Sequence, residues 1–531
     1  MLTQYLQFAA DRLGQKKTLD QLQAVVTSKQ GVVGITTAVA LIALANHFRS
    51  PKIDRGCPQV EGKGWFGYAT EEFRENPGKF LSEWHEKLGP VYGVKIFGHY
   101  ATVVSGPYVR EVFLDDRFSF IAAITKLFDP NLMTDSGHSS EQTAKNAADS
   151  IKRFLSPNLK HYTPRVIEHL NLGIEDWCGE VPAEGIEIEN AFPFLQHLVA
   201  RASASVFVGI ELAKNEELVD SFQNMVSNIS SGLKPKPWLE YFPSLTKLGM
   251  YMIGKTNPAV KRHRTQMANA LRPEVDRRLK AMASNDTNWD RPDDMLQHIL
   301  ESYPAPEGLD VITYLINWMT QLIFAALHTT SENGKVVLYR LLQHPEVMEE
   351  LYAEQNEVLA AAGYDESAGP EVFDREMLNK FVKLDSAVRE ACRLKNEFVG
   401  LPHENTTDKT LTLSNGAVIL PGEFVYINQF VNHRDPELQA AIDDVHQFKP
   451  FRFVGTDHNA AKVSEGFVFF GMGRHACPGR WFAIQEIKTI VSLLLRKYKV
   501  EPIDPIVFSN QERDAFPIGP CRIRLTPRKA L

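Results

Sequence analysis

The chain has 531 residues, of which 44% are hydrophobic, and a formal net charge of -7 at pH 7. This length can bury one large core or several ordinary ones, and the lack of strong basic charge argues against nucleic acid as a partner. Its five cysteines are widely separated, which argues against a disulfide framework and against a CxxC zinc pair. They are Cys57, Cys178, Cys392, Cys477 and Cys521. We therefore expect a reducing compartment and a small-molecule ligand.

The N-terminal region carries a candidate membrane anchor. Residues 31–45, GVVGITTAVALIALA, contain no charge and would reach through most of a hydrocarbon core of roughly 30 Å if the helix continues to residue 48. No signal-peptide cleavage site follows, so we expect an uncleaved anchor over about residues 31–48, within an N-terminal segment 1–48. A buried or interfacial helix is the alternative that such a short apolar run leaves open.

A hinge and a pair of strands follow the anchor. Residues 49–64 are rich in Pro, Gly and charge, which is typical of an extended linker, and a globular body is expected over residues 65–531. Residues 91–105, VYGVKIFGHYATVVS, indicate two strands around a Gly-His turn. Mostly helical patterns occupy the next few hundred residues, so the predicted fold class is mainly α, of the α+β type.

A long helix is predicted from Asp310 to about Leu342, because apolar residues recur there at helical spacing and no proline interrupts them. The recurring residues are Ile312, Leu315, Met319, Ile323 and Ala326. The helix contains AALHTT at residues 325–330, in which Thr329 and His328 are candidate proton-handling groups. Two simpler interpretations remain open: the Thr329 hydroxyl bonds back to a carbonyl one turn earlier, and His328 packs against another helix.

Further features lie in the C-terminal part of the chain. Glu390 and Arg393, in LDSAVREACRL, are spaced to share one helix face, where an exposed pair would contribute less than ~1 kcal/mol. Residues 417–430 have strand character, and residues 480–498 form an amphipathic helix pattern.

The segment FFGMGRHACPGRWFA, residues 469–483, is the strongest indicator of chemistry. Gly471, Gly473 and Gly479 allow the backbone to fold tightly around Cys477. The helix that follows points its N–H groups and positive dipole end at the sulfur, which favours a thiolate that can bind a soft metal axially. For a lone cysteine, the alternative is a small buried hydrophobe.

The same loop contains a weak dinucleotide-binding pattern, G-x-G-x-x-A, formed by Gly471, Gly473 and Ala476 between a strand-like VFF and a helix. Only about fifty residues follow it, too few for the βαβ halves that such a fold needs. We therefore discard the dinucleotide interpretation.

The cysteine segment resembles the loop F-x-x-G-x-[R/H]-x-C-x-G of the cytochrome P450 family. The matching residues are Phe470, Gly473, His475, Cys477 and Gly479. The resemblance implies haem b, iron protoporphyrin IX, as cofactor and Cys477 as its axial iron ligand, with Gly471 also in the haem-binding loop. His475 stands where most members have Arg, so the expected contact with a haem propionate is weaker and pH-sensitive, and the chain is most similar to fungal microsomal members.

Two helical stretches also match the family. AALHTT resembles the oxygen-binding stretch [A/G]-G-x-[D/E]-T-[T/S], with His328 in place of the acid and Thr329 retained, which implies catalytic roles for both. Glu390 and Arg393 match E-x-x-R, and Arg452 in FKPFRF matches the F-x-P-x-R-F that pairs with it. The resemblance assigns these three charges to holding the haem fold together.

Other family signatures are less complete. HRDPE, residues 433–437, matches a frequent family stretch, whereas the propionate-binding W-x-x-x-R has no convincing counterpart. Lys152 or Arg153 is expected to replace that contact. Substrate-pocket residues are expected at about 115–145 and 205–260.

The likeness spans roughly residues 65–525 and implies the P450 fold, a single large helical haem domain with small β-sheets. It implies a monooxygenase that uses O2 to hydroxylate or epoxidise a lipophilic substrate, such as a steroid, a terpenoid or another fungal secondary metabolite. Electrons would come from NADPH through a separate cytochrome P450 reductase, with cytochrome b5 as a further candidate partner. The expected location is the endoplasmic reticulum membrane, with a single-pass N-terminal anchor and a cytoplasmic catalytic domain.

Two alternatives stay open at this point. A haem-thiolate isomerase or dehydratase would act on a peroxide, and Thr329 argues against it. A non-catalytic haem-binding protein would bind carbon monoxide but would show no substrate-dependent use of NADPH.

Overall fold

The computed structural model describes residues 53–64, 67–127, 140–232, 243–284, 289–395, 400–439, 444–508 and 520–528. The chain divides into two compact units, Met1–Arg55 and Gly56–Leu531, and the second contains nearly all the described residues. The anchor expected over about residues 31–48 lies outside the described residues.

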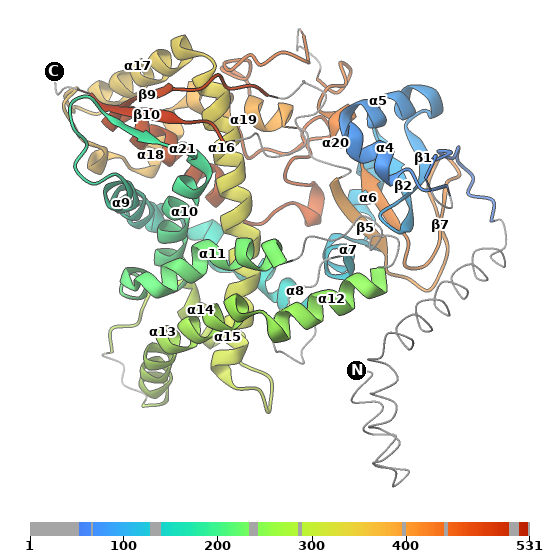
Figure 1. Cartoon of the computed structure of the whole chain (residues 1–531), viewed down its shortest axis with the longest axis horizontal. Coiled ribbons are helices and arrows are strands. Elements are labelled where there is room, and N and C mark those ends of the chain that lie inside the picture. The colour runs from blue at the N-terminus through green and yellow to red at the C-terminus, as the bar shows by residue number, and fades with distance from the viewer. Residues whose placement is uncertain are drawn as a thin grey trace, which may run out of the picture. The chain divides into compact units, whose positions relative to one another are not determined.

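A five-stranded sheet of order β1-β2-β8-β5-β3 lies at one side of the second unit (Figure 1). Strands β1 (Val91–Ile96) and β2 (His99–Val104) confirm the predicted strand pair. Phe97 and Gly98 at the turn have φ of 51° and 78°, the left-handed conformation that tight two-residue hairpins require. The other strands are β3 (Phe118–Ser119), β5 (Gly400–Asn405) and β8 (Phe424–Ile427).

Both faces of this sheet are covered by apolar side chains. Helices α4 (Thr70–Glu75) and α5 (Pro77–Leu88) contribute to the cluster on one face. The cluster on the other face includes α6 (Tyr108–Leu114) together with Val468 and Met472. The sheet therefore supports the segment that leads into Cys477.

Residues 58–60, which the sequence assigned to the hinge, pair with β1. The Val60 N–H donates to the Gly93 carbonyl at 2.8 Å, and the Gly93 N–H donates to the Pro58 carbonyl at 2.8 Å. Val60 is buried in the cluster that also contains Phe73 and Tyr92. Its apolar side chain gives the segment a place in the core that its Pro and Gly content did not predict.

The helices gather on the side opposite the sheet, where the three-stranded sheet also lies, whereas the two-stranded sheet lies beside the five-stranded sheet (Figure 1). The structure thus confirms the mainly α, α+β class. The helices on this side include α9 (Leu159–Cys178), α10 (Ala191–Phe207), α11 (Glu216–Gly232), α12 (Pro243–Thr256), α13 (Pro258–Ala283), α14 (Met295–Ser302), α17 (Pro345–Ala361), α18 (Arg375–Lys380) and α19 (Val382–Leu394). Between sheet and helices lie α7 (Phe120–Leu127), α8 (Ser140–Ser150) and a π-helical turn, Ile151–Leu155. The three-stranded sheet contains β4 (Ile186–Ile188), β10 (Ile523–Pro527) and β9 (Tyr498–Pro502), and β6 (Leu411–Thr412) pairs with β7 (Val418–Ile419).

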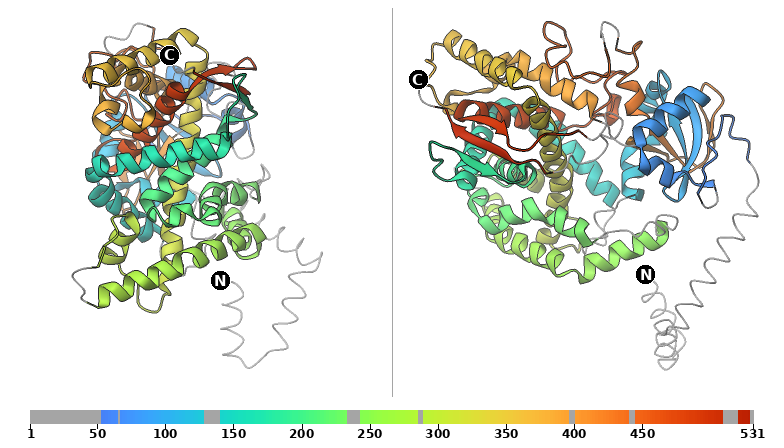
Figure 2. Two further views of the ribbon diagram at one scale, coloured as in Figure 1. Left: turned by 90° about the vertical axis from the view of Figure 1, so that its left-hand side faces the viewer. Right: turned by 45° about the horizontal axis from the view of Figure 1, so that its top comes forward.

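The predicted long helix runs through the middle of the helical part (Figures 1 and 2). It consists of α15 (Val311–Ile323), one π-helical turn (Phe324–His328) and α16 (Thr329–Leu342). Asp310 caps its start, because the carboxylate accepts a hydrogen bond from the Thr313 N–H at 3.0 Å. Among the described residues, this helix is the one whose length and composition would suit a membrane span, yet 61% of its most apolar window is buried within the protein. It is a core helix.

Two C-terminal predictions have different outcomes. The helix predicted over residues 480–498 is confirmed as α21 (Arg480–Lys497). The strand character of residues 417–430 is confirmed in two short strands and not over the whole range. It breaks into β7 and β8 around Gly422, whose φ is 74°, and ends in the short helix α20 (Gln429–Asn432).

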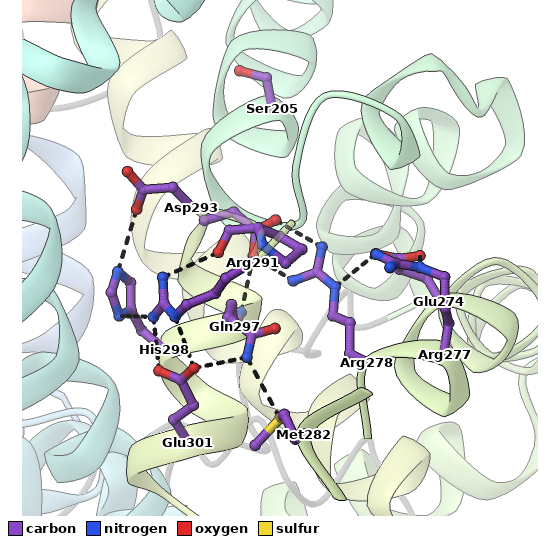
Figure 3. A network of polar contacts seen from close by, with 12 residues as sticks. Ser205, Glu274, Arg277, Arg278, Met282, Arg291, Asp293, Gln297, His298 and Glu301 are labelled. Atoms are coloured by element: carbon purple, nitrogen blue, oxygen red, sulfur yellow. Dashed lines mark hydrogen bonds and ion pairs between the residues drawn. The ribbon is translucent and has the colours of Figure 1, made fainter. Parts of the chain in front are cut away.

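A network of charged side chains links α13 to α14 and to the segment between them (Figure 3). The Arg278 guanidinium donates to both oxygens of Asp294, at 2.6 and 2.7 Å, and to Glu274 at 2.7 Å. Asp294 also caps α14 by accepting from the Gln297 N–H at 2.9 Å. Both Arg278 and Asp294 are 3% exposed, so this pair holds the two helices together from inside the fold.

Candidate active site

The backbone around Cys477 is folded back on itself between a short 3-10 turn, Gly473–His475, and α21. The Cys477 N–H donates to the Phe470 carbonyl at 2.7 Å. Gly471 and Gly473 have φ of 70° and 61°. A Cβ on Gly473 would lie 3.0 Å from a methyl group of Leu114 and 3.3 Å from the Phe113 carbonyl oxygen. Both glycines are therefore required for the loop to pass over α6.

Gly479 does not fit the same explanation. Its φ is -87°, and a Cβ built on it would meet no protein atom within 4 Å. The expectation that Gly479 is needed for a tight backbone turn was wrong. The space beside it is open and would admit a ligand close to the backbone.

The Cys477 thiol is subject to opposing effects. Burial raises its pKa, while the backbone N–H groups of Gly479 and Arg480 and the charge of Arg480 lower it. Burial dominates, so the start of α21 alone does not make this cysteine a thiolate as the sequence predicted. A bound metal cation would deprotonate the thiol outright.

The three predicted fold-holding charges are in contact. Arg393 donates to the two Glu390 oxygens at 2.8 and 2.9 Å, and Arg452 donates to Glu390 at 3.0 Å. Glu390 and Arg393 side chains are 0% exposed. The remaining Arg393 donors reach the carbonyls of His433 and Val445 at 2.8 and 2.7 Å. The pair on α19 therefore also fastens two loops.

His433, the first residue of HRDPE, connects this network to the cysteine segment. Its Nδ1 lies 3.1 Å from the Arg393 carbonyl, and its Nε2 accepts from the Val468 N–H at 2.9 Å. Burial lowers the pKa of His433 to about 3, so the neutral ring donates at Nδ1 and accepts at Nε2. Val468 precedes Cys477 by nine residues, so α19 and the cysteine loop are mechanically joined.

The middle of the long helix has an exposed strip formed by Ala325 and Thr329, although the residues on the turns before and after are mostly buried. The Thr329 hydroxyl donates to the Ala325 carbonyl at 2.6 Å, as the simpler interpretation predicted. This leaves the hydroxyl oxygen able to accept a further hydrogen bond. The strip lies at the π-helical turn, a feature often found at functional sites.

His328 is half-buried next to this strip. Its ring makes an edge contact with Phe192, at 5.5 Å between ring centroids. Its Nδ1 is buried without a hydrogen-bond partner. Burial lowers the pKa of His328, with Glu332 opposing the effect and Lys395 and Lys335 adding to it.

The helix with the exposed strip packs against the helix that follows Cys477. One turn beyond Thr330, a Cβ on Gly334 would lie 3.9 Å from the Ile487 side chain of α21. Among the described residues, no three His, Cys, Asp or Glu side chains are grouped to hold a metal ion.

Comparison with known proteins decides the family. The family model described as "Cytochrome P450" matches residues 58–525. The chain belongs to the cytochrome P450 family. It is 26% identical over 79% of its length to cytochrome P450 monooxygenase 151 of Postia placenta, covering 82% of that protein. It is 26% identical over 81% of its length to monooxygenase 103 of the same fungus, covering 84% of it. With the monooxygenase paxP of Penicillium paxilli it shares 27% identity, over 66% of each chain.

Because the chain belongs to the P450 family and its relatives are monooxygenases, it is an oxidoreductase of the haem-thiolate monooxygenase type. The family implies haem iron as cofactor. The described residues fit a haem. Cys477 offers one sulfur ligand, Gly479 leaves open space beside it, and Ala325 and Thr329 expose a strip of a core helix. A flat apolar cofactor would cover such surfaces.

Three basic side chains gather at one edge of this P450 site. The His475 ring lies 5.2 Å from that of His403, and the Lys152 amine lies 3.4 Å from the Arg474 carbonyl. Lys152 and His475 line one hollow of about 460 Å³. Arg153 instead pairs with Asp149 at 3.6 Å. Of the two residues considered for the W-x-x-x-R contact, Lys152 is the one beside the cysteine loop.

His403 is a candidate that the sequence interpretation missed. It is fully buried on β5, its Nδ1 lies 2.7 Å from the Leu401 carbonyl, and its Nε2 has no partner. Burial lowers its pKa to about 3. The sequence signal was weak: a histidine three residues after Gly400, where the strand pairing shifts between Gly400 and His403. That irregularity points the ring toward His475.

Proposed function

We propose that the chain is a fungal-type haem-thiolate monooxygenase in which Cys477 is the axial ligand of haem b. The observation that carries this proposal is the Cys477 loop. Gly471 and Gly473 hold it in a left-handed conformation against α6, and a half-buried cysteine stands at the start of α21 with open space beside Gly479. Haem ligated in this way supplies oxygen activation, because the thiolate pushes electron density toward O–O cleavage.

The protein's residues would hold the haem at its polar edge as well. Lys152, His403 and His475 are basic groups there, next to Arg474, and an anionic propionate placed among them would favour their charged forms. The otherwise unpartnered Nε2 of His403 supports this assignment. Phe470, Gly471, Gly473 and Gly479 would complete the loop against the haem face.

Thr329 and His328 are proposed to manage protons. Because the Thr329 hydroxyl donates to Ala325, its oxygen would accept a hydrogen bond from a water and orient it. His328 has a lowered pKa because of burial, so the neutral ring can take up a proton at one nitrogen and release one from the other. These roles rest on the exposed strip and on the family stretch that AALHTT resembles.

The substrate class, partners and location are part of the proposal. We expect a lipophilic substrate, such as a steroid, terpenoid or other fungal secondary metabolite, held by residues of about 115–145 and 205–260. Electrons would come from NADPH through a separate cytochrome P450 reductase, with cytochrome b5 as a further donor. Segment 1–48 would anchor the haem domain to the endoplasmic reticulum membrane through a linker that ends before residues 58–60, which pair with β1.

Replacing the ligand cysteine tests the proposal. Cys477→Ser should abolish the thiolate signature in the carbon monoxide difference spectrum of the reduced protein, because a serine hydroxyl is a poor soft-metal ligand. Cys178→Ser is the matched control, since Cys178 is also half-buried and free, and it should leave the spectrum intact. An unchanged spectrum in Cys477→Ser would overturn the assignment.

The reaction class is tested with reductase and NADPH. Oxygenated product should depend on both when extracted fungal lipids are supplied. Product formed from a lipid hydroperoxide without NADPH would instead support an isomerase or dehydratase. Deleting residues 1–48 should release the protein from membranes while the spectrum survives.

A further inference from the structure

A partly buried acid and a buried base follow His328 on the same helix. Glu332 and Lys335 form an ion pair at 3.3 Å, with side chains that are 15% and 3% exposed. Glu332 stands four residues after His328, so both side chains lie on one helix face. Charges are seldom buried inside a core helix unless they are paired or functional.

The pair is packed together with His328 under one aromatic ring. The Lys335 amine lies 5.3 Å from the centre of the Phe192 ring, and the same ring contacts His328 at 5.5 Å. Phe192 is the second residue of α10, and its N–H donates to the side chain of the capping residue Asn190 at 2.9 Å. His328, Glu332 and Lys335 therefore form one cluster, which we call the relay cluster.

The relay cluster has one more charged neighbour, at the end of α19. The Lys395 amine donates to the Asn333 side chain at 2.6 Å. Among the charged groups facing His328, Glu332 raises its pKa while Lys395 and Lys335 lower it, and burial has the largest effect. The carboxylate of Glu332 is thus the one acidic group in this set, flanked by two amines.

One ring nitrogen of His328 is free to form a hydrogen bond with such a neighbour. Its Nδ1 is buried without a protein partner, and a buried polar atom of this kind normally has a water or a functional contact. The strip of Ala325 and Thr329 lies beside it on the same helix. On this helix His328 stands one turn before Glu332 and directly before Thr329, so its ring is the titratable group between the carboxylate and the Thr329 hydroxyl.

We propose that Glu332 is a proton-relay residue that acts through His328 and replaces the carboxylate that P450 relatives carry one turn earlier. Glu332 takes a proton from a hydronium ion, which leaves as water, and passes it to one nitrogen of His328. The other nitrogen of His328 releases a proton toward water at Thr329, and proton exchange with solvent then returns the ring to its starting tautomer. Only O–H and N–H bonds break and form, Glu332 returns to its carboxylate form, and no electron moves. Lys335 holds the carboxylate in position. This inference rests on the proposed monooxygenase function.

The test compares two ways of driving one reaction. A lipophilic probe that the wild-type protein oxidises with reductase and NADPH is oxidised in parallel with iodosylbenzene, which delivers a single oxygen atom and needs no relayed proton. Glu332→Gln should lower NADPH-driven product by about a hundredfold, the lower end of general acid–base effects. More hydrogen peroxide should be released per NADPH, and iodosylbenzene-driven product should stay at the wild-type level.

Matched variants separate relay from packing. Glu332→Asp should restore much of the NADPH-driven rate with a shifted pH profile. Glu346→Gln is the control, because Glu346 is also beside a histidine, His344 at 3.3 Å, but on the surface of α17. It should change neither reaction.

A variant that removes both charges tests whether lost activity results from misfolding. Glu332→Gln with Lys335→Met leaves no buried charge unpaired and should bind haem yet remain uncoupled. Wild-type product per NADPH in this double variant would overturn the relay. Equal losses in the NADPH and iodosylbenzene reactions would also overturn it, because they indicate damage to the pocket. If the wild-type protein oxidises lipophilic probes under neither condition, the monooxygenase function itself fails.

Discussion

Two buried charge networks in this protein have the same chemistry but different tasks. In the Glu390–Arg393–Arg452 network, one carboxylate serves two guanidinium groups, and the spare donors reach backbone carbonyls of loops. In the Arg278–Asp294 network, one guanidinium serves two carboxylates, and Asp294 caps a helix. The first fastens loops that lead to Cys477, and the second fastens two helices (Figure 3).

This difference shows that the structural role of a charge network cannot be inferred from the burial of its side chains alone. What matters is where its remaining hydrogen bonds end. Donors that end on carbonyls of irregular segments determine the shape of those segments, because loops have no other regular hydrogen bonds. Donors that end on helix caps add stability to elements that already exist. Loss of the first network should therefore cost haem binding, and loss of the second should cost only stability.

The largest effect is expected for Arg393→Ala. It leaves Glu390 buried and without its main partner, at a cost on the order of 3–5 kcal/mol, and it frees the carbonyls of His433 and Val445. The protein should accumulate without haem or fail to accumulate. Haem per polypeptide, measured by the pyridine haemochrome assay, checks this, and normal haem content would contradict the assigned role.

Asp294→Ala sharpens the comparison from the other side. Arg278 would remain buried without its bidentate partner and α14 would lose its cap, so the free energy of unfolding should fall by about 3 kcal/mol. Haem content at low temperature should stay normal. Asp294→Asn is the milder control, since it keeps the cap. Haem loss in soluble, folded Asp294→Ala would show that the two networks do not differ in task.

The two networks should also lose their contributions to the free energy of unfolding over different pH ranges. Burial lowers the pKa of His433 to about 3, so the unfolded chain binds a proton first as pH falls below about 6.5. The contribution of His433 to the free energy of unfolding is complete above about pH 6.5 and is lost toward pH 3, by up to about 1.4 kcal/mol per pH unit. Glu274 beside Arg277 has a lowered pKa, so its contribution is lost only below its usual value. Urea unfolding at a series of pH values checks this, and His433→Gln should flatten the slope above pH 5.

The smallest effect is expected at an exposed pair. Lys145 and Glu141 lie 2.7 Å apart on α8, with side chains 52% and 40% exposed. Lys145→Met should change the free energy of unfolding by less than about 0.5 kcal/mol. A change comparable to that of Asp294→Ala would mean that distance, and not burial, sets the strength of these pairs.

The sequence predicted regular elements well where one physical signal acted alone. The helix from Asp310 to Leu342 and the strand pair β1–β2 followed from apolar spacing, although the turn lies at Phe97–Gly98, one residue before the predicted Gly-His turn. The strand character of residues 417–430 is confirmed, but Pro421 and Gly422 divide it into β7 and β8, which pair in two different sheets. The structure differs from the linker predicted at residues 58–60, because the buried side chain of Val60 outweighs the linker-like composition of the segment.

The candidate site was predictable where the motif is contiguous. Cys477 and its glycines, and the Glu390–Arg393 pair, are local patterns that the resemblance made specific. His403 and Glu332 were not found, because their surroundings come from segments distant in the chain: His475 for His403, and Phe192 for the relay cluster. No spacing rule within one strand or helix contains that information.

The π-helical turn at Phe324–His328 also determines how the chain tolerates insertions and deletions. Each residue of an α-helix turns the side chains by about 100°, so a helical wheel started at Ile312 loses its phase at this turn, and Ala326, which shared the buried face by spacing, is only half-buried. Removal of one residue there would restore an ordinary helix with little rotation of α16 relative to α15, and it would remove the wide turn at which Ala325 and Thr329 are exposed. A one-residue gap opposite this turn in an alignment would therefore identify relatives whose long helix presents a different face on the side where oxygen would bind.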